Sequence, residues 1–275
     1  MGKLTENQWD ELITEYKAGG TTMALAKKYD IGRSSVRKNL KSRGVKFHPP
    51  GFLRTKRAEE NTNVHVFDEL TPASAYWLGL LFADGCVLDN NQVTLVLKST
   101  DGAHIDRFKD FMQSNNRVHN GSGLRRGKRW FTNALRVQNA HLARTLASYG
   151  MGPRKSLTAE AREDLVPNKH FWTGYVDGDG SVYSWTKKGE ELPRIGFSAV
   201  GSEKMMQQLA EFAEPIIGKR MNVRKSENIF CLACEGSFAY KIIKYLYGDA
   251  EIALDRKMTK AKEIIDYYEK KLASA

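Results

Sequence analysis

Apolar residues recur three or four positions apart in three short groups along the first 45 residues, which predicts three helices. Thr5 and Gln8 have the spacing of a capping box before the first helix. We expect one residue of Thr21-Thr22 to cap the second helix and one of Ser34-Ser35 to begin the third. The apolar groups are Trp9, Leu12, Ile13 and Tyr16, then Met23, Leu25, Ala26 and Tyr29, then Val36 and Leu40.

Two longer segments are apolar over a helix length and then reach Asp-Gly: 75–87 (AYWLGLLFADGCV) and 170–182 (HFWTGYVDGDGSV). A similar succession of strand and helix patterns follows each segment, so we predict the order αββαββα twice. The fold class is therefore α+β, with a trihelical unit before two pseudo-symmetric half-domains. Strand patterns occupy 92–98, 117–120, 128–137, 194–200, 219–225 and 228–234, and helix patterns occupy 101–114, 139–149, 202–214 and 237–247.

The ends of the two long helices carry recognisable signals. Thr71-Pro72 places an N-cap and a first-turn proline before one helix, and Asn168 can cap the other. Gly85 and Gly180 stand where a helix often ends in a left-handed residue.

Small residues line one face of each long helix, because Gly79 and Ala83 lie four positions apart, as do Gly174 and Gly178. Such faces let two backbones approach closely, so the two helices are expected to pack on each other. Asp84 and Asp179 would then meet at the negative ends of both helix dipoles. A divalent cation would relieve this repulsion, and oxygen ligands suit Mg²⁺ beside a phosphodiester.

Segments 77–85 (WLGLLFADG) and 172–180 (WTGYVDGDG) resemble the two motifs of a single-chain LAGLIDADG homing endonuclease. The resemblance covers 68–270 and implies a saddle of antiparallel strands in the major groove of double-stranded DNA with a long, asymmetric site. It implies a monomer that cleaves both strands across the minor groove and leaves 3′ overhangs. Roughly two or three divalent ions are expected, Mg²⁺ first, with Mn²⁺ or Ca²⁺ as substitutes for binding. The candidate metal-site residues are Asp84, Asp179, Gly85 and Gly180.

The resemblance also implies basic residues around the catalytic metals. Lys155 and Lys257 are the candidates, and Lys98, at the end of an apolar strand, is a third. The corresponding position in the second half falls near Ala199, so the role of Lys98 would be asymmetric. The first motif, 77–85, departs from the family pattern, because Phe82 stands where the second motif, 172–180, has Asp177. That position is usually structural in the family, so its loss does not threaten the metal site.

The N-terminal segment 21–44 resembles the helix-turn-helix of resolvase/invertase-type recombinases and small regulators, whose third helix enters the major groove. A three-helix packing module with a solvated basic face is the alternative. Residues 47–67 are predicted to be a basic linker that either follows DNA or is merely solvated. The expected divisions are thus 1–46, 47–67, 68–160 and 161–275.

Basic and polar residues of each part are candidate DNA contacts. Residues of the third helix would reach base edges and phosphates, and residues of the linker would reach the DNA backbone. Residues of the strands could contact either bases or backbone. The candidates are Arg33, Ser34, Ser35, Arg37, Lys38, Arg54, Lys56, Arg57, Arg117, His119, Arg125, Arg126, Lys128, Arg129, Lys187, Arg194, Arg224 and Lys225.

Charge supports a polyanionic partner. The 275 residues hold 43 Lys+Arg against 32 Asp+Glu, a net charge of +11. Residues 1–57 hold 13 of these basic residues and 5 of the acidic ones, a net of +8, so the excess is concentrated at the N-terminus.

Composition narrows the compartment. No segment has the roughly 20 consecutive apolar residues of a membrane span, and the N-terminus lacks the apolar region of a secretory signal. Three cysteines make no disulfide framework, so we expect a reducing, cytoplasmic or organellar location. Met1 at the start and the lack of splice-junction residues at the end lead us to expect a freestanding protein rather than an intein.

The sequence therefore predicts a site-specific, metal-dependent DNA endonuclease. A transcription regulator or an intron maturase on the same fold, which binds nucleic acid without cutting it, is the alternative. Because both motifs keep the aspartate, the nuclease is favoured.

Overall fold

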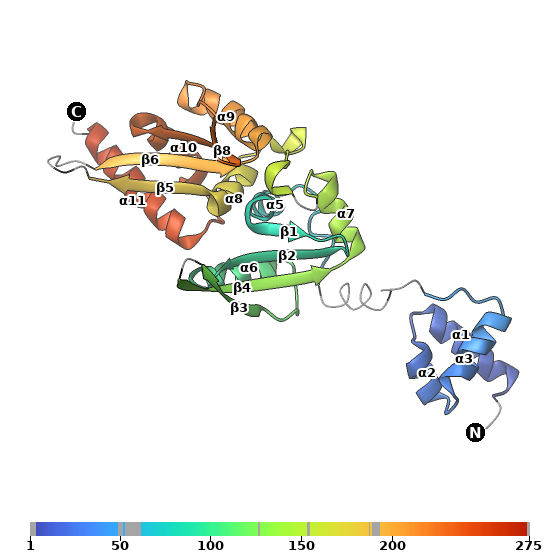
Figure 1. The fold of residues 1–275 in the computed structure, drawn as a ribbon. Helices are drawn as coiled ribbons and strands as arrows, with labels where there is room; N and C mark the ends of the chain where they lie inside the picture. The colour runs from blue at the N-terminus through green and yellow to red at the C-terminus, as the bar shows by residue number, and fades with distance from the viewer. Residues whose placement is uncertain are drawn as a thin grey trace. The chain divides into compact units, whose positions relative to one another are not determined.

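The computed structural model describes residues 4–48, 52, 62–125, 127–152, 155–186, 188 and 193–273. The chain divides into two compact units, Met1–Glu60 and Asn61–Ala275, which Figure 1 draws in blue and in the remaining colours. In this described part of the chain, no helix is long and apolar enough to cross a membrane.

The first unit contains the helices α1 (Glu6–Lys17), α2 (Thr22–Lys28) and α3 (Arg33–Ser42). The capping box of Thr5 and Gln8 forms, and Thr21 caps α2. The expected serine start of α3 is wrong: the helix begins at Arg33, and Gly32 is its N-cap without a side-chain hydrogen bond. The buried core comprises Trp9, Leu12, Tyr16, Leu25, Ala26, Val36 and Leu40.

One expected core position of this unit lies outside the core. Met23 is 69% exposed, because the first turn of α2 directs it away from the apolar cluster. The short helix therefore contributes only Leu25 and Ala26 as buried side chains.

The second unit confirms the predicted order αββαββα in two successive halves. The first half contains α5 (Pro72–Asp84), β1 (Gly85–Val87), β2 (Gln92–Lys98), α6 (Gly102–Phe111), β3 (His119–Arg125), β4 (Lys128–Gln138) and α7 (Ala140–Ser148). The second half contains α8 (Lys169–Asp179), β5 (Gly180–Trp185), β6 (Arg194–Gly201), α9 (Glu203–Ile217), β7 (Arg224–Ser226), β8 (Ile229–Glu235) and α10 (Gly236–Tyr247). In the described residues, the second half is followed by a further helix, α11 (Asp255–Ala273), and the first half by short 3₁₀ turns.

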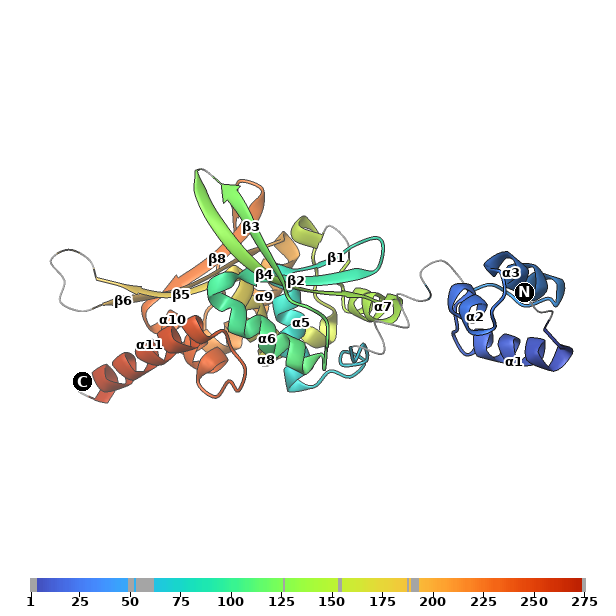
Figure 2. The same cartoon turned by 90° about the horizontal axis from the view of Figure 1, so that it is seen from below.

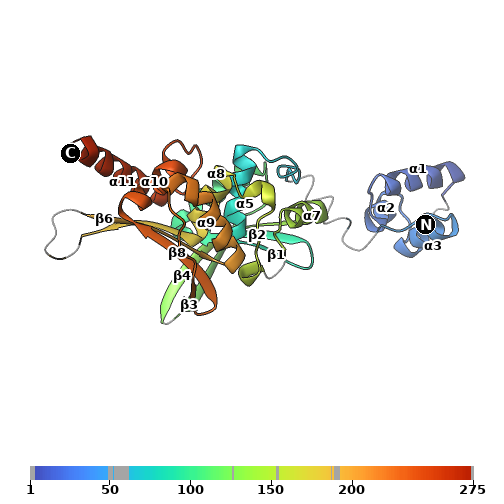
Figure 3. The same ribbon diagram turned by 90° about the horizontal axis from the view of Figure 1, so that it is seen from above.

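The strands form two antiparallel sheets with the same topology, β1-β2-β4-β3 and β5-β6-β8-β7. Helices α5 and α8 lie between the sheets at the centre of the unit (Figure 1). The hairpin of β3 and β4 projects away from the helices (Figure 2). Most of the helices cover one side of the strands and leave the other side open (Figure 3). The α+β fold class and the two pseudo-symmetric halves are therefore confirmed.

The core of this unit extends into the segment predicted as a linker. Val64 and Phe67 are each 1% exposed and pack in the same apolar cluster as α5 and α8. The predicted linker, which ran to residue 67, thus includes at its end part of the second unit. Alternation alone could not place these two residues, because neither an adjacent helix nor an adjacent strand extends their pattern.

The starts of the central helices follow the prediction, and their ends do not. Thr71 forms a capping box with Ser74, and Asn168 accepts from the backbone of His170 and Phe171. Gly85 and Gly180, however, are extended, with φ of -88° and -106°. A Cβ at these positions would lie 2.5 Å from Leu81 O and 2.7 Å from Val176 O, so close approach of the preceding turn excludes a side chain there.

Candidate active site and nucleic-acid interface

Helices α5 and α8 touch through the small residues that the sequence singled out. A Cβ at Gly79 would lie 1.9 Å from Phe171 O, and one at Gly174 would lie 1.9 Å from Tyr76 O. The two contacts are reciprocal, since Gly79 and Gly174 hold equivalent places in their helices. The two backbones therefore meet about a pseudo-two-fold axis, as predicted.

This packing brings Asp84 and Asp179 to the same place. Each is the last residue of its helix, and a Cβ at Gly178 would lie 3.1 Å from Asp84 Oδ2. Asp84 is open to solvent and Asp179 is half-exposed, so a small ligand can reach both carboxylates.

The surroundings of these carboxylates disfavour their charge. Desolvation by the neighbouring protein and the charge of Asp179 raise the pKa of Asp84 to about 6. Desolvation also raises the pKa of Asp179, although the ammonium groups of Lys155 and Lys257 oppose the rise. Two oxygen-rich groups that repel each other are a donor set suited to a hard divalent cation.

Two buried lysines bind the ends of the central helices. Lys257, in the first turn of α11, donates from Nζ to the carbonyls of Val176, Asp177 and Gly180 at 2.5, 2.7 and 2.6 Å. These hydrogen bonds satisfy carbonyl groups that a helix end leaves unpaired. Gly180 was a candidate metal-site residue, and its carbonyl accepts a hydrogen bond from Lys257.

Lys155 holds the equivalent place in the first half. It lies in a 3₁₀ turn, Lys155–Leu157, and donates to Phe82 O at 2.5 Å and to Ala83 O at 3.4 Å. Desolvation lowers the pKa of Lys155 and lowers that of Lys257 to about 8. The structure therefore brings both candidate lysines beside the two aspartates.

Lys98 ends β2 as an exposed side chain. Its expected counterpart near Ala199 is wrong. Gly85 pairs with Leu95 and Gly180 pairs with Ala199, so Leu95 and Ala199 are equivalent. Lys98 comes three residues after Leu95, and the equivalent position three residues after Ala199 is Ser202. Ser202 is buried and caps α9, which leaves the second half without a lysine at this place.

Asp177 is fully buried within a polar network that the sequence did not reveal. Its Oδ2 accepts from Tyr76 Oη and from Leu254 N, both at 2.6 Å, and its Oδ1 accepts from Tyr247 Oη at 2.8 Å. Burial nevertheless raises the pKa of Asp177 to about 6. The role is structural, as the resemblance implies. The partners come from three separate elements, so no local motif could predict them.

The network continues to His104. Tyr76 Oη lies 2.7 Å from His104 Nε2, and since Tyr76 donates to Asp177, the imidazole donates to Tyr76. Desolvation lowers the pKa of His104 to about 4, so the ring is neutral with its hydrogen on Nε2.

Strand register separates the candidate DNA contacts into two faces. Core residues of β2 such as Leu95 and Leu97 face the helices, so alternation places Lys98 on the opposite, outer face. Pairing across the first sheet then places His119, Lys128 and Arg136 on that outer face, and Arg129 on the other. Arg136 was missed, although its alternation with buried Leu135 and Val137 indicates its direction.

The second sheet shows the same division. Arg194 alternates with buried Ile195 and so lies on the outer face. Arg224 pairs with Cys231, which pairs with Val200 on that face, whereas Lys225 pairs with Phe230 on the other. Both outer faces thus carry basic residues, which is the arrangement a DNA groove requires.

The remaining candidates lie elsewhere. Arg117 is exposed just before β3, and Arg125 closes β3 by pairing with Lys128. In the first unit, α3 buries Val36 and Leu40 and exposes its candidate DNA contacts, which are Arg33, Ser34, Ser35, Arg37 and Lys38. Outside the described residues lie Arg54, Lys56, Arg57, Arg126 and Lys187.

Comparison with solved structures identifies the fold. The chain is similar to the homing endonuclease I-WcaI bound to its DNA recognition sequence, with a TM-score of 0.56 and 14% identity over 77% of this chain and 94% of that one. It is also similar to a double mutant of I-SmaMI, with a TM-score of 0.50 and 13% identity over 74% and 93%. No family model and no curated protein matches the sequence. The second unit therefore has the single-chain LAGLIDADG endonuclease fold.

Proposed function

We propose that this protein is a site-specific endonuclease that hydrolyses both strands of double-stranded DNA. The observation that carries the proposal is the convergence of Asp84 and Asp179 at the ends of two helices in van der Waals contact. The basic outer faces of both sheets supply the complementary surface for a duplex. The similar fold of I-WcaI, described as bound to its DNA recognition sequence, agrees with this partner.

We propose further that Asp84 and Asp179 hold divalent cations, with Mg²⁺ as the ion best suited to oxygen ligands. Ions held by these two carboxylates would supply activation of a water molecule and stabilisation of the leaving oxygen of a phosphodiester. Because the two carboxylates repel each other in a desolvated place, a cation also offsets the charge that the fold concentrates there.

The lysines act on the aspartates both through the backbone and through their own charge. Lys155 and Lys257 offset the negative ends of α5 and α8 by donating hydrogen bonds to carbonyl groups in their last turns. Their ammonium groups favour the ionised carboxylates electrostatically. Lys98, on the outer face of β2, is a candidate to contact phosphate in one half only.

The decisive experiment is cleavage of a plasmid library with random inserts in the presence of Mg²⁺. The parent protein is compared with Asp84→Asn and Asp179→Asn, which keep side-chain size and remove charge. We expect discrete double-strand ends with 3′ overhangs from the parent. Each substitution should lower the cleavage rate by at least about 100-fold, the effect of losing one strong electrostatic group, and leave DNA affinity nearly unchanged.

Two results would contradict the proposal. Full cleavage by either aspartate variant would exclude the assigned metal ligands. If the parent protein bound a DNA sequence selectively and in a salt-sensitive way without any cleavage, the protein would instead be a transcription regulator or a maturase that does not cut.

The first unit is proposed to extend the recognised sequence. Its α3 exposes the side chains of Arg33, Arg37 and Lys38, and each matched base contact contributes about 1–3 kcal/mol. Deletion of residues 1–50 should therefore weaken binding by at least about tenfold while the saturated cleavage rate changes little. Equal affinity of the deleted and full-length proteins, measured by electrophoretic mobility shift, would show that this unit does not contact the target.

A further inference from the structure

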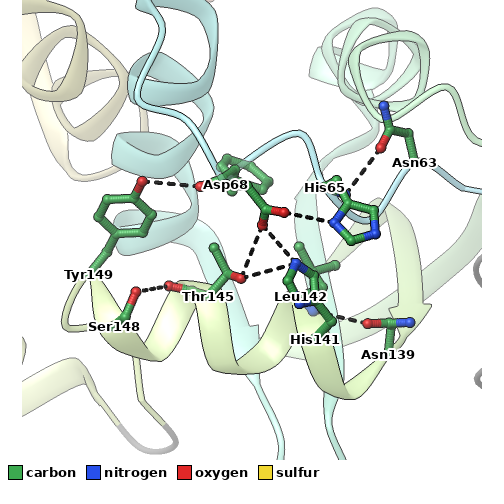
Figure 4. A network of polar contacts seen from close by, with 10 residues as sticks. Asn63, His65, Asp68, Asn139, His141, Leu142, Thr145, Ser148 and Tyr149 are labelled. Atoms are coloured by element: carbon green, nitrogen blue, oxygen red, sulfur yellow. Dashed lines mark hydrogen bonds and ion pairs between the residues drawn. The ribbon is translucent and has the colours of Figure 1, made fainter.

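A second cluster of metal-ligating side chains lies away from the two motif aspartates, where the chain enters the second unit. His65 and Asp68 come from the segment before α5, and His141 comes from the first turn of α7 (Figure 4). One ligand atom of each residue lies within 4.8 Å of those of the other two. In the part of the chain that the structure describes, this is the single group of three such residues.

The three side chains already point at one another. His65 Nδ1 lies 2.7 Å from Asp68 Oδ2, and His141 Nε2 lies 2.7 Å from Asp68 Oδ1. The two imidazole rings have centroids 4.4 Å apart. A tetrahedral zinc ion with bonds of about 2.0–2.1 Å holds its ligand atoms about 3.4 Å apart, so only small rotations are needed to admit one.

The backbone on both sides of the cluster is fixed. Tyr149 Oη, from the C-cap of α7, donates to Phe67 O at 3.0 Å, and Phe67 is buried. Asp68 N donates to His65 O at 3.0 Å, which forms a turn and holds both residues on one side. Ordering the ligands before binding reduces the entropy cost of binding a metal.

The chemistry of the donors selects the class of ion. Imidazole nitrogens suit Zn²⁺ and other late transition metals, whereas Mg²⁺ prefers oxygen ligands. A neutral imidazole can carry its hydrogen on the far nitrogen, so both histidines can present a lone pair to the ion.

We propose that His65, Asp68 and His141 form a zinc site that ties the entry segment of the second unit to α7. Two histidines and one carboxylate provide three protein ligands, and the side-chain exposure of 63%, 37% and 35% leaves a fourth position for water. Thr145 Oγ1 donates to Asp68 Oδ1 at 3.3 Å and orients the carboxylate. The site is independent of the proposed nuclease chemistry.

The test uses the full-length, tag-free protein with Asp84→Asn and Asp179→Asn, so that zinc cannot bind at the motif aspartates. Zinc binding is titrated by calorimetry in excess Mg²⁺, and Co²⁺ is added separately to read coordination from its visible absorption. His65→Gln and His141→Gln remove one ligand each. His119→Gln, at an exposed position in β3, is the matched control.

We expect one zinc ion per chain, a tetrahedral Co²⁺ spectrum and a higher Tm with zinc. Each ligand variant should bind at least about tenfold more weakly and lose the rise in Tm, while the control keeps both. Absence of zinc binding, or equal binding by the ligand variants, would overturn the proposal. Circular dichroism verifies folding, and His65→Gln alone decides if His141→Gln does not fold.

Discussion

The two halves of the second unit share strand order and motif geometry but differ at one pair of contacts between α5 and α8. In one, Tyr76 of the first half donates to Asp177 of the second. In the other, related by the pseudo-two-fold, Phe171 packs edge-on against Phe82 with ring centroids 5.2 Å apart. Two equivalent positions in the interface therefore hold a polar contact in one case and an apolar contact in the other.

This difference teaches that backbone packing, not the identity of one side chain, defines the interface. The reciprocal glycine contacts are equal in both halves, whereas Asp177 additionally receives Tyr247 Oη and Leu254 N from the last part of the chain. The carboxylate therefore holds the segment that leads into α11, a helix with no equivalent among the described residues that follow the first half.

The largest expected effect concerns this buried carboxylate. Asp177→Ala leaves two phenols and one backbone amide without an acceptor, so we expect a loss of about 3–5 kcal/mol in the free energy of unfolding. Phe82→Ala should lose a similar amount, about 3–5 kcal/mol, through a cavity instead. Urea unfolding measures both.

The two causes are separable with a second substitution. Tyr76→Phe combined with Asp177→Leu imitates the apolar pair of Phe171 and Phe82, so this double variant should be more stable than Asp177→Ala. Tyr76→Phe should not restore stability to Phe82→Ala, because that variant loses stability through a cavity. A change below about 0.5 kcal/mol in Asp177→Ala, as at surface positions, would contradict the role of the network.

The two lysines give a smaller, unequal effect. Lys257→Met removes three hydrogen bonds to carbonyl groups and should lower the free energy of unfolding by about 2–3 kcal/mol. Lys155→Met removes one short and one long hydrogen bond and should lower it by about 1–2 kcal/mol. Unfolding is measured without metal or DNA, and Lys98→Met is the exposed control. Equal losses in both halves would refute the asymmetry.

The smallest effect should be the same in both halves. Thr71 and Asn168 each cap a central helix with their side chains, so Thr71→Ala and Asn168→Ala should each cost about 1 kcal/mol. Thermal unfolding reports the shift in Tm. A much larger loss in one half would show that its cap has a further role.

Much of the fold is predictable because it depends on local patterns. The repeat of αββαββα follows from apolar periodicity, and the contact of α5 with α8 follows from small residues four positions apart. The meeting of Asp84 and Asp179 follows from both, since each aspartate directly ends its helix. The predictions for Met23, for the start of α3 and for the counterpart of Lys98 were wrong, because the spacing of residues in the sequence determines such positions only weakly.

The sequence by itself determined the elements, the internal duplication and the place of the paired aspartates, because helix period and residue size act within a few residues. Only the tertiary structure decided the network of Asp177, the binding of helix ends by Lys155 and Lys257, and the cluster of His65, Asp68 and His141. Most of these contacts join residues 70 or more positions apart, as between Asp177 and Tyr247 and between Asp68 and His141. Such pairs meet only when packing has closed the chain, so no local pattern encodes them.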